Sequence, residues 1–164
     1  MVTNPLNGKA RAFPLRVVLT LTTGKLLTKG RGERDNGIGD LYELLGHMTG
    51  EAPFTHSLGR FADECRPWVY RWYPELASPK LAAEVEHLAD MLGPDMDRAA
   101  VATLIQAWLS RLIVKGICQA EYEIGQIPQD DHESKPPYDE LVAMMGTDEN
   151  VIVIDCEEDS DGPV

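Results

Sequence analysis

The sequence predicts a mostly helical α+β protein, in which an N-terminal β-hairpin packs on a bundle of four to five helices and a disordered acidic tail ends the chain. Three observations predict this class. Apolar residues recur at helical spacing between residues 40 and 113, β-forming residues gather before residue 29, and the last ten residues hold five acids. We therefore expect a flexible arm over residues 1–13, one compact domain over 14–146 and a tail over 147–164.

The predicted hairpin begins with the β-rich run from Leu15 to Thr22, which Pro14 and Gly24 bound. The run 25–28 follows at once, and Thr23-Gly24 between two such runs is typical of a hairpin turn. Residues 29–37 contain three glycines and predict a polar loop.

Four stretches show the single apolar stripe of an amphipathic helix. The first two extend over residues 40–49, with Gly50 as a stop, and from residue 55 to a break or restart at Pro67. The third begins at Ser78-Pro79, a cap followed by proline, and the fourth follows Asp95 or Asp97 and ends at Gly116. The stripes predict a shared core that includes Leu44, Leu45, Phe61, Leu104, Ile105 and Trp108.

Beyond residue 116 the pattern weakens, and only short elements are expected. Residues 120–127 predict one strand, 128–137 a loop and 139–145 a short helix. The apolar run 151–154 predicts either an edge strand or a docking peptide for a partner sheet.

Charge is unevenly distributed along the chain, whose net charge is −12. Residues 1–34 carry seven basic residues and one acid, whereas residues 35–164 carry eight basic and twenty-six acidic residues. An acidic body repels phosphate backbones, so direct nucleic-acid binding is disfavoured and a basic partner surface is favoured. The three cysteines form no Cys-x-x-Cys pair and no membrane-length apolar run or secretory signal is evident, which favours a cytoplasmic protein.

The familiar catalytic and cofactor motifs are absent from the sequence. The stretch 22–26 resembles a phosphate loop but lacks its earlier glycine, and no Gly-x-Ser-x-Gly elbow or dinucleotide fingerprint occurs. No two histidines share the i, i+4 spacing of a zinc helix, and we interpret residues 130–133 as a solvated linker, with weak metal binding as the alternative. We expect no cofactor, no metal site and no catalytic residues.

Two groups of side chains are candidates for partner recognition. His56, Arg60, Asp63 and Glu64 share one helical face, which is either a solvated stripe or a recognition face. Four aromatic rings fall within residues 68–73 and cannot all face one core, so some are expected to be exposed. Together with the acidic tail, the predicted partner-binding residues are His56, Arg60, Asp63, Glu64, Tyr70, Tyr73, Asp155, Glu157, Glu158 and Asp159.

The chain also resembles a family of uncharacterised phage and prophage proteins that is known only as a domain of unknown function. The resemblance rests on residues 14–20 and 22–27, on Gly39–Leu45 with Met48-Thr49-Gly50, on Phe54-Thr55-His56, and on Glu64-Cys65 with Pro67. It covers residues 14–75 well and 120–145 loosely. The resemblance implies a phage accessory protein that binds host machinery, and it implies no catalytic residues.

These observations lead to one functional expectation and two alternatives. We expect a phage-encoded, non-enzymatic binding protein of the host cytoplasm, which inhibits or modulates a host process by occupying a basic surface. An antiphage nuclease or CRISPR complex is the expected kind of target. The first alternative is a small enzyme of unrecognised class that uses His56 with Glu64 or Cys65, and the second is an accessory protein of virion assembly.

Overall fold

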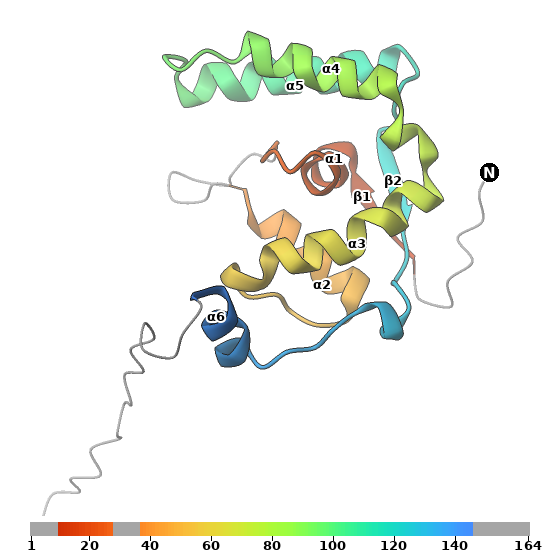
Figure 1. The fold of residues 1–164 in the computed structure, drawn as a ribbon. Coiled ribbons are helices and arrows are strands. Elements are labelled where there is room, and N and C mark those ends of the chain that lie inside the picture. Colours follow the sequence, from red (N-terminus) through yellow and green to blue (C-terminus); the bar gives the residue numbers. More distant parts are fainter. Residues whose placement is uncertain (1–9, 28–36, 146–164) are drawn as a thin grey trace, which may run out of the picture. The chain divides into compact units, whose positions relative to one another are not determined.

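The computed structural model describes residues 10–27 and 37–145 (Figure 1). The predicted strand at 151–154 and the partner-binding residues predicted in the tail lie outside the described residues. The chain divides into two units, residues 1–134 and 135–164, and the second contains α6 (Pro137–Met145). The described part contains six α-helices and a two-stranded antiparallel sheet, which confirms a mostly helical α+β fold.

The first unit contains the other five α-helices and both strands of the described residues. Its regular elements are β1 (Arg11–Pro14), α1 (Leu15–Thr23), α2 (Gly39–Thr49), α3 (Leu58–Trp72), α4 (Pro79–Met91), α5 (Arg98–Val114) and β2 (Glu121–Ile124). Three 3₁₀ helices, η1 (Thr55–Ser57), η2 (Pro74–Ala77) and η3 (Gln129–Asp131), connect or follow them.

The predicted N-terminal hairpin is wrong, because residues 15–23 form helix α1. The threonines that favoured a strand instead turn their hydroxyls onto the helix: Thr20 donates to the Arg16 carbonyl at 2.7 Å and Thr23 to the Leu19 carbonyl at 2.6 Å. Gly24, expected in a hairpin turn, ends the helix with a φ of 71°. Helix α1 was not among the four to five helices that the sequence predicted, and this explains why the structure has six among its described residues.

The only sheet of the described residues joins two segments far apart in the sequence. β1 pairs antiparallel with β2, with Arg11 opposite Ile124 and Pro14 opposite Glu121. β1 therefore includes residues 11–13, which the sequence placed in the flexible arm. The amide of Leu15 extends the pairing by donating to the Ala120 carbonyl at 2.9 Å. This hydrogen bond ties the start of α1 to the segment that follows α5.

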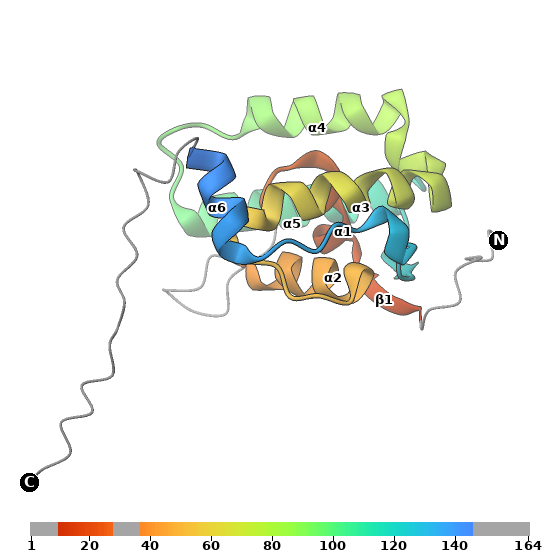
Figure 2. The same ribbon diagram turned by 60° about the horizontal axis from the view of Figure 1, so that its bottom comes forward.

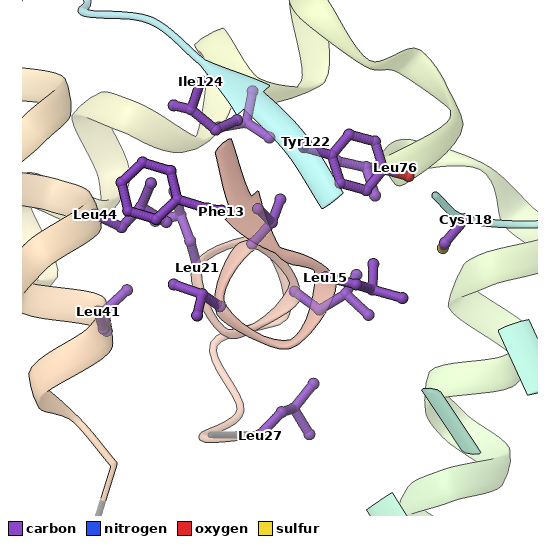
Figure 3. Packing of buried hydrophobic residues seen from close by; sticks show 14 of the residues in the cluster. Phe13, Leu15, Leu21, Leu27, Leu41, Leu44, Leu76, Cys118, Tyr122 and Ile124 are labelled. Atoms are coloured by element: carbon purple, nitrogen blue, oxygen red, sulfur yellow. The ribbon is translucent and has the colours of Figure 1, made fainter. Parts of the chain in front are cut away.

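Helix α1 lies at the centre of the core. Seven of its nine residues are buried, and Figure 3 shows α1 end-on, with apolar side chains arranged around it. Leu41 and Leu44 approach from α2, Phe13 from β1, and Tyr122 and Ile124 from β2. A helix that is apolar on nearly every side requires neighbours on nearly every side, and the sheet and helices supply them.

Helix α3 runs without interruption through Pro67, where the sequence predicted a break or restart. Proline removes the hydrogen bond to the carbonyl four residues earlier, which belongs to Asp63. Both Pro67 and Asp63 are exposed, so that carbonyl lies on the solvated side of the helix. The tertiary contacts of Phe61, Cys65 and Val69, all buried, hold the two halves in line.

Helices α4 and α5 begin where the sequence predicted, because both starts are fixed by local caps. Ser78 accepts from the Leu81 amide at 3.2 Å, and Asp97 accepts from the Ala100 amide at 2.7 Å. The two helices are joined by the Trp108 indole, which donates to the Glu84 carbonyl at 3.2 Å. No helix of the described residues is long and apolar enough to cross a membrane.

The predicted core is confirmed for four of its six members. Leu44, Leu45, Phe61 and Trp108 are buried, but Leu104 and Ile105 are only partly buried. The buried residues of α5 are Trp108, Leu109 and Leu112, all in its C-terminal half. Ile113 and Val114 are exposed, so a single apolar stripe does not describe the whole helix.

This difference predicts unequal costs for the same substitution on one helix. We expect Leu112→Ala to lower the free energy of unfolding by about 2–5 kcal/mol, because it empties a fully buried site. Leu104→Ala should cost about 1 kcal/mol, because the site is already partly solvated. Urea denaturation of both variants measures the difference, and equal losses would contradict the described packing of α5.

Candidate functional site

The most unusual polar arrangement in the structure is a histidine held between two carboxylates. His132 follows η3, and its side chain is only 4% exposed. Its Nδ1 lies 2.7 Å from Glu64 Oε2 and its Nε2 lies 2.7 Å from Glu51 Oε2. A neutral imidazole has one N–H, so donation to both carboxylates requires the protonated ring. The arrangement is therefore a carboxylate–imidazolium–carboxylate cluster.

The electrostatics of the cluster agree with a protonated ring. Burial opposes the charged form of His132, but the hydrogen bonds from its ring to Glu64 and Glu51 raise its pKa above the ordinary histidine value. The hydrogen bond to His132 in turn lowers the pKa of Glu51, against the smaller effect of burial. Each partner thus stabilises the charged form of the other.

Glu64 is the hub through which the cluster joins two parts of the chain. Its Oε1 accepts from Arg60 Nη1 at 2.9 Å, one helical turn earlier on α3, and from the Glu133 amide at 3.2 Å. Arg60 also donates to the Glu133 carbonyl. The rings of Phe61 and His132 meet edge to face, with centroids 4.8 Å apart. The segment after η3 is therefore fixed to α3 by several polar contacts at once.

This geometry corrects the interpretation of residues 130–133 as a solvated linker. Asp130, Asp131 and Glu133 are exposed as expected, but the side chain of His132 is only 4% exposed. The two carboxylates that hold it are 68 and 81 residues away in sequence. No local signal marks such a contact, and the acids on either side of His132 suggested solvation instead.

In this geometry the cluster holds two parts of the chain together and does not present a general base. With both ring nitrogens donating, His132 has no lone pair with which to accept a proton from a substrate. The two carboxylates lie against opposite ring nitrogens, so the three groups do not converge on one point. Among the described residues, no group of three or more His, Cys, Asp or Glu side chains is arranged to hold a metal ion.

Three of the polar residues predicted for partner recognition lie within about one turn of each other on α3, but they belong to two different ion pairs. Arg60 pairs with Glu64, but Asp63 pairs with Arg66 at 2.9 Å. His56 lies on η1, where its ring stacks on Phe54 with centroids 5.8 Å apart, and its Nε2 is buried without a hydrogen-bond partner. The described contacts therefore bring only two of the four residues together.

The two predicted tyrosines use their hydroxyls within the protein. Tyr70 donates to the Thr22 carbonyl at 3.0 Å, and Tyr73 donates to the Glu123 carbonyl at 2.7 Å. The Tyr73 ring also meets the Tyr122 ring edge-on at 4.7 Å. Both tyrosines are partly buried, and these bonds tie α3 to α1 and the residue after α3 to β2. The predicted tail residues lie outside the described residues.

Cys65, which the enzyme alternative paired with His56, is fully buried. Burial, reinforced by the charge of Glu64, raises the pKa of its thiol to about 12. A thiol of this kind is almost entirely protonated at neutral pH and is a poor nucleophile. Its surroundings are those of a small core residue.

Comparison with known proteins gives a partial family match. Residues 13–78 match the family described as "Domain of unknown function (DUF7736)". The match extends from β1 to η2 and includes Glu51 and Glu64, but it covers less than half of the chain and ends before His132. No curated protein and no solved structure matched the chain. The description names neither an activity nor a phage origin, so the resemblance is confirmed only as a domain of unknown function.

The cluster predicts a specific dependence of stability on pH. Because folding raises the pKa of His132, its contribution is complete below the unfolded histidine pKa of about 6.5 and is lost as pH rises through the folded value. Because folding lowers the pKa of Glu51, its contribution is complete above about 4.5 and is lost as pH falls through the folded value. The cluster therefore stabilises most between about pH 4.5 and 6.5.

Replacing the ring tests this dependence directly. We expect His132→Gln to lower the free energy of unfolding by about 1–3 kcal/mol at pH 6, because it leaves two carboxylates without their shared donor. The loss should shrink as pH rises above the folded pKa of His132. Urea denaturation from pH 5.5 to pH 9 measures it, and a constant loss across that range would contradict the protonated state.

Proposed function

We propose that this protein is a non-enzymatic binding protein, which occupies a basic surface of a partner macromolecule and thereby modulates or inhibits it. One observation supports the proposal above the others. Residues 119–134, here called the acidic segment, contain five acids and no lysine or arginine. Four of these acids are exposed and form no ion pair among the described residues: Glu121, Glu123, Asp130 and Asp131.

The acidic segment is held in place along its length by backbone contacts. Its carbonyls accept from the Tyr73 hydroxyl at residue 123 and from the His47 ring at residue 124, at 2.7 and 2.8 Å. The amide of Ile127 donates to the Met48 carbonyl at 2.8 Å, and His132 closes the segment. A fixed backbone reduces the conformational entropy lost on binding, so these carboxylates are preorganised for a partner.

Three cations of the neighbouring elements β1 and α3 are already paired with acids. Arg11 of β1 pairs with Glu43, and Arg60 and Arg66 of α3 pair with Glu64 and Asp63. Each pair is neutral as a whole, so the exposed acids of the segment set the local potential. A surface of this sign attracts a basic patch and accelerates its association.

The negative charge of the acidic segment limits the classes of partner that it can bind. We propose a protein, or a protein–nucleic acid complex, with an exposed basic surface, because a free nucleic acid would be repelled. The finer proposal is a phage-encoded inhibitor of an antiphage nuclease or CRISPR complex in the host cytoplasm. That form rests on the sequence resemblance alone, and the geometry of the acidic segment adds only the sign of the charge.

Charge reversal on the acidic segment tests the proposal. Once affinity capture and mass spectrometry identify a partner, Glu121→Lys with Glu123→Lys should slow association about tenfold at low salt. The rate for the unmodified protein should fall as salt increases, because steering is screened over about 8 Å at physiological ionic strength. Association kinetics at several salt concentrations measure both effects.

A matched control separates local from overall charge. Glu86→Lys with Asp90→Lys changes the net charge equally, on exposed residues of α4. This pair of substitutions should slow association clearly less than the pair at residues 121 and 123. Equal slowing by both pairs would show that only net charge matters and would overturn the role of the acidic segment.

Stoichiometry distinguishes the binding protein from an enzyme. A binding protein inhibits its target at about one copy per target, whereas an enzyme acts at far lower doses. We expect a dose–response curve that saturates near equimolar protein. His56→Ala should alter this curve only if His56 touches the partner, and not through a loss of catalytic turnover. Full activity at a hundredfold lower dose that is lost in His56→Ala, with the fold intact, would overturn the proposal.

A further inference from the structure

A polar hollow of about 400 Å³ lies where α4 and the C-terminal half of α5 meet. Its volume falls within the range of about 300–1,000 Å³ that small-ligand sites occupy. Helical spacing brings its lining together, since residues 80, 83, 84 and 87 share one face of α4 and residues 111 and 115 are one turn apart on α5. The lining residues are Lys80, Ala83, Glu84, His87, Arg111 and Lys115.

The lining reverses the charge of the rest of the molecule. Residues 35–164 contain only eight lysines and arginines against twenty-six acids, yet three of the eight line this hollow. Glu84 is its one acid. The hollow therefore carries two positive charges in excess, without counting His87.

Glu84 organises the cations. Its Oε2 accepts from Arg111 Nη2 at 2.6 Å, and its Oε1 lies 3.4 Å from Lys115 Nζ. Desolvation opposes its ionisation, but these two cations lower the pKa of Glu84 overall. The carbonyl of the same residue accepts from the Trp108 indole, so both helices are fixed at this point. One carboxylate thus positions two cations and neutralises only one.

The two remaining charged or titratable side chains of the hollow, Lys80 and His87, form no hydrogen bond or ion pair among the described residues. Lys80 is exposed near the start of α4, opposite the end of α5 that supplies Lys115. Donors that are satisfied by water alone can exchange it for a charged acceptor.

From this lining we propose that the hollow binds a small polyanion, a molecule that carries two or more carboxylate or phosphate groups. Two excess charges match two anionic groups, and the space exceeds what one such group fills. No Phe, Tyr or Trp lines the hollow, so it lacks the stacking surface of a typical nucleobase site. The site is independent of the acidic segment, which attracts the opposite charge.

Calorimetric titration with citrate and with pyrophosphate, each against sodium chloride of equal ionic strength, tests the site. We expect saturable binding of at least one probe at one site per chain. Binding of citrate alone would identify a polycarboxylate, and binding of pyrophosphate alone a phosphate ligand. If neither probe binds saturably, the proposal is overturned.

Two variants locate the binding. Lys80→Gln should raise the dissociation constant about tenfold, because it removes a charged donor that has no role in the fold. Ala83→Leu should abolish binding by filling the hollow while leaving every charge in place. Lys25→Gln, which removes an exposed lysine outside the hollow, should have no effect. Equal weakening by Lys25→Gln and Lys80→Gln would show nonspecific attraction and overturn the site, and melting curves without ligand confirm that each variant is folded.

Discussion

The first unit depends above all on the burial of α1. Because this helix is apolar on nearly all sides, it cannot lie on a surface, and its neighbours are arranged to cover it. The α2 and α3 helices pack against it (Figure 2), and a hydrogen bond beside the β1–β2 pair ties its first residue to residue 120. The covering of one helix therefore determines where the chain returns after α5, and with it the path of the acidic segment.

The His132 cluster follows from that path. Once β2 is paired with β1, the hydrogen bond from Ile127 to Met48 directs the chain past the end of α2. Glu51 lies just beyond that end and Glu64 lies on α3, so the next histidine passes between them. A buried charge cluster stabilises less than an apolar contact of equal size, but it demands one register. The cluster thus makes the position of the acidic segment unique.

The sequence predicted those elements whose causes are local. Ser78 and Asp97 cap α4 and α5 within three residues of the amides they accept from, so each start could be inferred from a few residues. The class of α1 could not, because its β-branched residues favour a strand and only the surrounding core favours a helix. The partial exposure of Leu104 could not be predicted either, because it depends on how closely other elements pack against that half of α5. His132 depends on contacts more than sixty residues away, which no spacing rule contains.

Net charge describes this protein poorly, because charges act over short distances. At physiological ionic strength a field decays over about 8 Å, so a ligand responds to the residues beside it and not to the total of −12. The acidic segment carries no lysine or arginine, and the hollow between α4 and α5 carries one acid among its cations. From the sequence we expected a basic N-terminal segment followed by an acidic body. Within that body, the exposed acids of the acidic segment and the cations that line the hollow lie on different elements, and this local arrangement is the basis of the two proposed binding sites.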